Sequence, residues 1–145
     1  MKNRLVDVTS IHIIPTTPTN LLTTLLDHNQ LSRFFGASIT EIRPEIAGAP
    51  KGGKGTQRLV SMLGFKFIEE ITDASVDKIE YAIQGNFPLK GHRGVIEFYP
   101  SDTKTVLRYQ ITGQVPRFIP VFLMALIIRR DLNLALKKLE VFHAC

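Results

Sequence analysis

Hydrophobic and polar residues alternate along much of this chain with the two-residue period of a β-strand. The first such segment, Leu5–Ile14, is rich in β-branched residues, and Pro15 follows it. Six later segments have a strand-like pattern and are separated by turn residues: Ile39–Ala47, Thr56–Leu63, Phe65–Thr72, Asp77–Gln84, His92–Tyr99 and Thr105–Gly113. Short strands that follow one another through short turns predict an antiparallel meander.

A helical spacing interrupts this pattern directly after the first strand. Thr17 precedes Pro18, an order typical of an N-cap followed by the first helical residue. Leucines then recur at helical intervals between positions 21 and 26. A second short helix is expected over about Asn29–Phe35, with Gly36 as its C-terminal cap.

The end of the chain predicts one long helix, from about Pro116 to about Phe142. The expected buried face carries Phe118, Phe122, Ala125, Arg129, Leu132, Leu136, Leu139 and Phe142, with Ile128 and Ala135 beside it. The order is therefore one strand, two short helices, six strands and one long helix. We expect an α+β fold in which a curved antiparallel sheet of about seven strands wraps around the long C-terminal helix.

Composition and charge narrow the class of protein. The 145 residues are 44% hydrophobic and 21% charged, without a repeat or a linker-like segment, so a single domain over residues 1–145 is expected. The net charge of +5 favours anionic partners in general. The basic residues are scattered, however, with doublets only at Arg129-Arg130 and Lys137-Lys138. Because nucleic-acid binding needs a basic stripe with stacking aromatic residues, no nucleic-acid partner is expected.

Several other kinds of site are also not expected. The single cysteine, Cys145, allows neither an internal disulfide nor a cysteine-based metal site. The four histidines show no metal-ligand spacing, so no metal and no other cofactor is expected. The N-terminal residues lack the apolar core of a signal peptide, and the longest apolar run, Phe118–Ile128, is too short to span a bilayer. A cytoplasmic protein is therefore expected.

The segment GAPKGGKGT, residues 48–56, has part of the pattern of a phosphate-binding P-loop. Gly53 and Lys54 match that pattern, but Gly55 stands where a magnesium-binding hydroxyl belongs. A P-loop also needs a helix directly after it, whereas the following residues lead into strand-like sequence. We therefore interpret the segment as a flexible glycine turn between two strands.

The order of elements, together with several short motifs, resembles the START-related superfamily. This superfamily, also called SRPBCC proteins, includes birch-pollen-allergen-like and polyketide cyclase/dehydrase-like members with the helix-grip fold. The resemblance covers nearly the whole chain and is carried by Ile14–Pro18 with Leu21-Leu22 and Leu26-Asp27, Gly55–Arg58, Phe67–Ile71, Asp77–Ile83, and Gly94–Pro100 with Thr105–Tyr109. The chain departs from the family pattern in having no tryptophan, since Leu22 and Tyr109 stand at the two usual positions.

The resemblance implies a cavity between the sheet and the C-terminal helix. Members of this superfamily hold lipids, sterols, polyketides or quinones there, and a minority perform cyclisation or dehydration. It therefore implies that this protein binds a hydrophobic small molecule. The alternatives are a polyketide cyclase/dehydrase-type enzyme that uses the same cavity and a protein–protein adaptor with a filled core. The motifs indicate a fold and leave the question of an enzyme open.

Strand alternation assigns one side of each strand to the inside of the fold. In four strands the more apolar side carries polar residues inward with it, namely Glu69, Tyr81, His92 and Tyr109. Two strands are ambiguous. Val60 and Met62 would bring Arg58 inward, and one of the two choices for Leu5–Ile14 would bring His12 inward.

The expected ligand-binding residues are Arg58, Glu69, Tyr81, His92, Tyr109, His12, Phe67, Ile96, Phe98, Phe122 and Leu126. Arg58 and Glu69 lie on neighbouring strands, so an ion pair is the simplest way to satisfy both charges. Such a pair is either structural or orients the polar end of an apolar ligand. A catalytic role would require His92 or His12 beside Glu69 as a general base, with a tyrosine hydroxyl near the reacting oxygen.

The first half of the long helix is apolar on nearly every side. A helix with one buried face should carry polar residues on the other, so the outer face of Phe118–Ile128 is expected to meet a partner. Candidates are a second copy of the chain, a membrane surface and the loop Asn86–Gly91. Arg129 and Arg130 would suit a membrane surface. A homodimer is preferred because it is the commoner reason for an exposed apolar patch.

Overall fold

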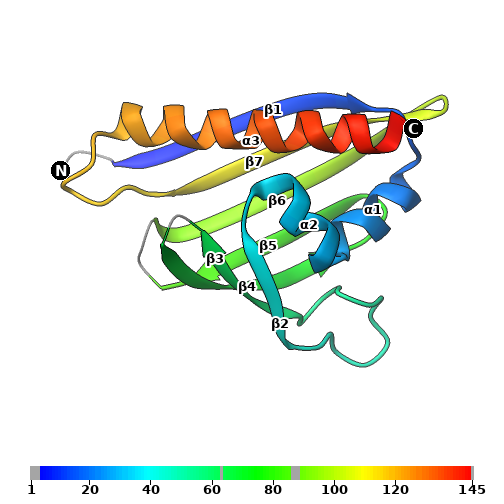
Figure 1. Ribbon diagram of the computed structural model, residues 1–145, viewed down its shortest axis with the longest axis horizontal. Coiled ribbons are helices and arrows are strands. Elements are labelled where there is room, and N and C mark those ends of the chain that lie inside the picture. The colour runs from blue at the N-terminus through cyan, green and yellow to red at the C-terminus, as the bar shows by residue number, and fades with distance from the viewer. Residues whose placement is uncertain (1–3, 63, 86–88, 145) are drawn as a thin grey trace.

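The computed structural model describes residues 4–62, 64–85 and 89–144. Figure 1 shows an antiparallel sheet with a long C-terminal helix lying along one part of it. In chain order the elements are β1 (Leu5–Ile14), α1 (Pro18–Leu26), α2 (His28–Phe35), β2 (Ser38–Arg43), β3 (Gln57–Met62), β4 (Phe65–Ala74), β5 (Lys78–Gln84), β6 (Lys90–Ser101), β7 (Lys104–Gln114) and α3 (Val121–Ala144). The expected α+β helix-grip arrangement is confirmed.

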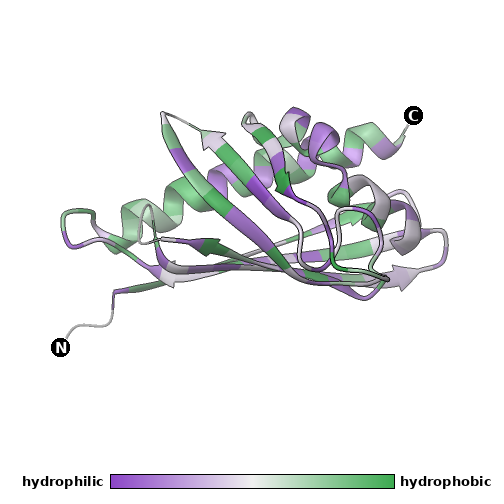
Figure 2. Cartoon of the chain, turned by 90° about the horizontal axis from the view of Figure 1, so that it is seen from below, coloured by the Kyte–Doolittle hydropathy of each residue, from purple (hydrophilic) through white to green (hydrophobic). Residues whose placement is uncertain are grey.

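The seven strands form one sheet in the order β1-β7-β6-β5-β4-β3-β2. Every neighbouring pair is antiparallel, and β1 joins the sheet at the far edge from β2, beside β7. Hydrophobic and hydrophilic residues alternate along the strands, as Figure 2 shows. The alternation gives the sheet an apolar inner face, which the helices cover, and a more polar outer face.

The start of α1 and the end of α2 lie where the sequence indicates, whereas α2 begins at His28, one residue before the expected Asn29. The Thr17 side chain accepts a hydrogen bond from the backbone N–H of Asn20, and Pro18 follows it as the first helical residue. Asp27 closes α1 and caps the start of α2, where its carboxylate accepts from the N–H of Asn29. Gly36 ends α2 in the left-handed conformation that glycine adopts without strain.

The buried face of α3 differs from the predicted one mainly in the first half of the helix. Met124, Leu132, Ala135, Leu136 and Leu139 are buried. Phe118 and Phe122 are each 76% exposed, Arg129 is exposed as well, and Phe142 near the end of the helix is 39% exposed, so these four predictions were wrong. Residues 118–128 are apolar all around, and periodicity alone cannot choose a face where every side is apolar.

Some predicted boundaries also require correction. β2 ends at Arg43 rather than at Ala47, because Pro44 has no N–H to donate to the sheet. α3 begins at Val121, whereas the sequence placed its start near Pro116. Cys145, the strand end at residue 63 and residues 86–88 of the loop considered as a helix partner lie outside the described residues.

The glycine segment is a packed turn between β2 and β3. No helix follows it, because β3 begins at Gln57. The N–H of Gly55 donates to the carbonyl of Ile71, and the N–H of Gly52 donates to the Glu45 carboxylate. A β-carbon on Gly52 would lie 2.3 Å from the carbonyl oxygen of Leu26. Gly52 therefore allows close packing against α1, and the flexibility expected of this turn stays a prediction.

Candidate functional site

A cavity of about 370 Å³ lies on the inner face of the sheet, beneath the first half of α3 and the helices α1 and α2. Most of its lining is apolar. The sheet contributes Ile39, Arg58, Val60, Met62, Phe65, Phe67, Glu69, Ile71, Ile79, Tyr81, Ile83, His92, Ile96, Tyr109 and Ile111. The rest of the wall consists of Leu25, Leu31, Phe35, Ala37, Leu89, Ile119, Met124, Ile127, Ile128, Asp131 and Leu132.

The strand register brings the polar side chains of the lining together. Arg58 on β3 lies directly opposite Glu69 on β4, and Ile71 lies opposite Tyr81 on β5. Across the next strands, Ile96 on β6 lies opposite Tyr109 on β7. Because residues two apart share a face, one polar group from each of these strands points into the same space.

Arg58 and Glu69 form an ion pair within the fold. Arg58 Nη1 lies 3.7 Å from Glu69 Oε1, and the two side chains are 1% and 16% exposed. This distance allows an electrostatic contact but is longer than a good hydrogen bond. The remaining guanidinium nitrogens, Nε and Nη2, are buried and have no hydrogen-bond partner among the described residues. The ion pair expected from the sequence is therefore present, and it leaves two of the three guanidinium nitrogens without a partner among the described residues.

The hydroxyl groups of Tyr81 and Tyr109 form a hydrogen bond of 2.5 Å. Both side chains are buried, and their rings meet edge to face with centroids 6.2 Å apart. Gly94 makes room for this arrangement, because a β-carbon there would lie 2.1 Å from the Cζ atom of Tyr81. One hydroxyl donates to the other, so the second one keeps its own O–H for another acceptor.

His92 completes the polar part of the wall. Its ring centroid lies 6.2 Å from that of Tyr81, and both ring nitrogens are buried without a hydrogen-bond partner among the described residues. Burial lowers the pKa of His92 to about 4. The imidazole is therefore neutral at physiological pH and presents one donor and one acceptor nitrogen.

Burial controls the charge of the other polar groups as well. It raises the pKa of the Glu69 carboxyl, and the nearby Arg58 guanidinium opposes this rise. Burial likewise raises the pKa values of the Tyr81 and Tyr109 hydroxyls, so both stay protonated across the physiological range. The cluster thus contains one permanent cation, one carboxyl and a set of neutral hydrogen-bonding groups.

Most of the residues predicted from the sequence line this cavity. They are Arg58, Glu69, Tyr81, His92, Tyr109, Phe67 and Ile96. His12, Phe98, Phe122 and Leu126 are not part of the lining. Phe98 is buried in the core, whereas Phe122 and Leu126 are exposed on the outer side of α3.

His12 shares the inner side of β1 with Val8 and Ser10. Of the two orientations considered for this strand, the one with His12 pointing inward is therefore confirmed. The Ser10 hydroxyl, however, donates to Asn133 of α3, which packs along β1 (Figure 1). This part of the sheet is therefore covered by the helix, and His12 lies outside the cavity.

Sequence reasoning missed the helical part of the wall. Phe35 from α2 and Met124, Ile127 and Asp131 from α3 all line the cavity. For α3 the signal was present in the spacing of these three residues, which recur every three or four positions. It was masked because the neighbouring residues Phe122 and Leu126 are equally apolar.

Two other kinds of site were sought among the described residues. No group of three or more His, Cys, Asp or Glu side chains there could hold a metal ion. None of the helices in that part of the chain is long and apolar enough to cross a bilayer.

No family model and no curated protein sequence matches this chain. Solved structures match it over nearly its whole length. A START superfamily protein from Mycobacterium smegmatis has 14% sequence identity and a TM-score of 0.78, over 95% of this chain and 97% of that one. Ara h 8.0201 has 14% identity and a TM-score of 0.69, over 97% and 98%. A protein from Thermus thermophilus, TTHA0849, has 18% identity and a TM-score of 0.68, over 93% and 94%.

These matches establish the class of fold. The chain has the START-related helix-grip fold, as its motifs predicted. Identities this low show the fold alone, so membership of the polyketide cyclase/dehydrase-like subgroup stays a prediction.

Proposed function

We propose that this protein binds a hydrophobic small molecule, such as a lipid, polyketide, sterol or quinone-like compound, in the cavity between the sheet and α3. The observation that carries the proposal is the cavity itself, whose wall is apolar except for one cluster of mostly buried polar groups and Asp131 of α3. Ligand sites in proteins commonly combine apolar walls with a few placed polar groups. A volume of about 370 Å³ suits one small molecule.

Organic extraction tests this proposal directly. Freshly purified protein is denatured in solvent, and the extract is compared by mass spectrometry with that of a mock purification. We expect one lipophilic compound in near-stoichiometric amount. An empty extract, together with no thermal shift across a panel of lipids and quinones, would contradict the proposal. It would favour an enzyme that holds its substrate only transiently, or an adaptor protein, although an adaptor was expected to have a filled core.

An enzyme of the cyclase/dehydrase type is a second candidate. It is favoured by the position of His92, a neutral imidazole without a partner among the described residues, in the same wall as the Tyr81–Tyr109 pair. A neutral imidazole can accept a proton from a ligand carbon acid while a tyrosine hydroxyl stabilises the resulting enolate oxygen. The variant His92→Ala separates the two candidates through turnover. Both a binding protein and an enzyme should keep binding the ligand in this variant. Only an enzyme should show turnover in the wild type and lose it in the variant.

We also propose that two copies of the chain associate through the apolar surface at the start of α3. This surface consists of Phe118, just before the helix, and Phe122, Leu123 and Leu126 on it, which are all exposed. Large exposed apolar patches usually mark an interaction site. Sedimentation analysis should find a dimer for the wild type and a monomer for Phe122→Ser. A wild-type protein that stays monomeric at high concentration would contradict this contact.

A further inference from the structure

We propose that the ligand of this cavity carries a carboxylate group and that Arg58 binds it. This inference rests on the proposed binding function and names the polar end of the molecule bound. It starts from the hydrogen-bonding groups of the cavity wall that have no partner among the described residues.

The unsatisfied groups of Arg58 are donors that lie on one edge of the guanidinium. Its Nε and Nη2 atoms are both buried, and neither has an acceptor within the described part of the chain. In an arginine side chain these two nitrogens point their N–H bonds in parallel, while Nη1 points to the other side. Nη1 is the atom that faces Glu69. The edge left over has the geometry that binds the two oxygens of a carboxylate side by side.

The charges favour an anion over a neutral acceptor. An arginine stays protonated even when it is buried, so its charge needs compensation. Glu69 compensates it from 3.7 Å and is itself 16% exposed, so the carboxyl of Glu69 is less enclosed than the guanidinium. A buried charge destabilises the fold when it has no close counter-charge. A ligand carboxylate would supply both a close negative charge and two acceptors.

Other groups in the wall fit the same ligand. Of the two tyrosine hydroxyls, one keeps an O–H that the Tyr81–Tyr109 hydrogen bond does not use. Burial raises the pKa of Glu69, so this carboxyl can take up a proton when a second carboxylate arrives beside Arg58. The described lining contains no lysine and no second arginine, and Asp131 adds a second carboxyl group beside that of Glu69, so one monovalent anion matches the site better than a dianionic phosphate. Both nitrogens are buried in this structure, so a ligand can reach them only after side chains of the wall shift.

The experiment compares decanoic acid with 1-decanol, which have the same apolar tail and differ in the head group. Isothermal titration calorimetry at neutral pH measures both affinities for the full-length protein. We expect the acid to bind at least about tenfold more tightly, the gain of one or two charge-assisted hydrogen bonds. Equal affinities would overturn the carboxylate proposal and leave the proposed binding function standing. No binding of either compound would count against both.

Two double variants assign the preference to Arg58. Arg58→Met with Glu69→Met removes the whole ion pair and leaves no unpaired buried charge, so this variant is expected to fold. It should bind decanol as the wild type does and prefer the acid by less than about twofold. The matched control, Arg108→Met with Glu97→Met, removes an ion pair of 2.9 Å from the outer face of the sheet and should keep the full preference. A preference that survives in the first variant would overturn the role of Arg58, and the wild-type comparison remains decisive if that variant fails to fold.

Discussion

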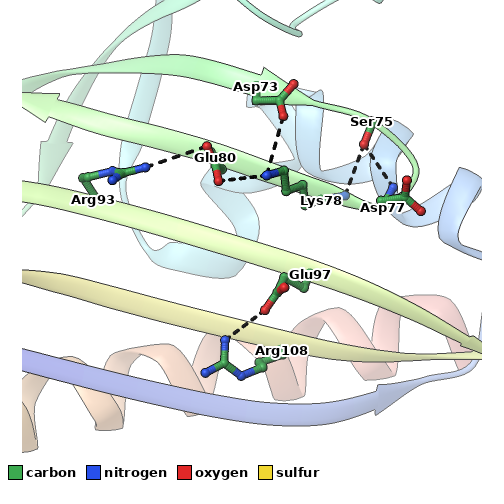
Figure 3. A network of polar contacts seen from close by, with 8 residues as sticks. All are labelled: Asp73, Ser75, Asp77, Lys78, Glu80, Arg93, Glu97 and Arg108. Carbon is green, nitrogen blue, oxygen red and sulfur yellow. Dashed lines mark hydrogen bonds and ion pairs between the residues drawn. The ribbon is translucent and has the colours of Figure 1, made fainter.

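The two faces of the sheet carry the same kind of ion pair in different surroundings. On the outer face, Arg108 Nη1 donates to Glu97 Oε1 at 2.9 Å, and Lys78 and Arg93 both reach Glu80 (Figure 3). On the inner face, Arg58 faces Glu69 at 3.7 Å. Both Arg108–Glu97 and Arg58–Glu69 are directly opposite one another in neighbouring strands.

The difference lies in the surroundings rather than in the pairing. The outer side chains are about one-third exposed or more, apart from Glu80, so water solvates and screens them. Arg58 has no such solvation and keeps two nitrogens without a partner among the described residues. An unsatisfied buried charge is costly to keep, which is why such groups concentrate at functional sites. Four predictions test this contrast, from the largest expected effect to the smallest.

Removing one member of the inner pair should be the most damaging change. Arg58→Met leaves Glu69, which is only 16% exposed, beside the cavity without its cation, so we expect the free energy of unfolding to fall by up to about 3–5 kcal/mol at neutral pH. Urea denaturation monitored by circular dichroism measures this loss. Adding Glu69→Met should restore most of it. A loss below about 1 kcal/mol would show that the inner pair behaves like an outer one.

Acid should destabilise the protein through His92. The pKa of His92 is lowered to about 4 by burial, so the unfolded chain binds the proton more tightly than the folded one. The free energy of unfolding therefore decreases as the pH falls from about 6.5 to about 4, by up to about 3 kcal/mol. The raised pKa of Glu69 acts in the opposite direction.

The contribution of His92 is isolated by measuring wild type and His92→Leu over the same pH range. The other titrating groups, including His143, are present in both proteins, so their effects largely cancel in the difference. The free energy of unfolding of His92→Leu relative to that of the wild type should increase toward low pH. A constant difference would mean that His92 has the same pKa in the folded protein as in the unfolded chain.

A methyl group under Tyr81 should have an intermediate effect. Gly94→Ala places a β-carbon 2.1 Å from the Cζ atom of that ring, so the tyrosine must move. Overpacking of this kind costs about 1–3 kcal/mol. Thermal unfolding measures the cost, and the near-ultraviolet circular dichroism of the tyrosines reports the shift. Arg93→Ala, an outer-face change on the same strand, is the control and should alter neither signal.

The outer pair should contribute least. Arg108→Met with Glu97→Met is expected to change the free energy of unfolding by no more than about 1 kcal/mol, because water already solvates both groups. Urea denaturation at low and high salt provides the measurement. A loss comparable to that of Arg58→Met would remove the contrast between the two faces.

The sequence alone determined which elements form and which side of most strands faces inward. Successive residues of a strand point to opposite faces of the sheet. The apolar residues two positions away on the same strand therefore showed that Glu69, Tyr81 and Tyr109 point inward. The Thr17 cap and Gly36 likewise marked helix ends through local chemistry. The pairing of Arg58 with Glu69 was predictable because the two strands are consecutive and only two residues separate them in the chain.

Only the tertiary structure decided how α3 turns toward the sheet. Where residues 118–128 are apolar on all sides, each rotation of the helix buries a similar apolar area, and contacts with β1 and α2 select one. That selection put Met124 in the cavity wall and left Phe122 outside it. It also placed His12 beyond the cavity, because the second half of the helix covers that part of β1. Local periodicity fixes which residues share a face, whereas the space enclosed between two faces depends on contacts between residues far apart in the chain.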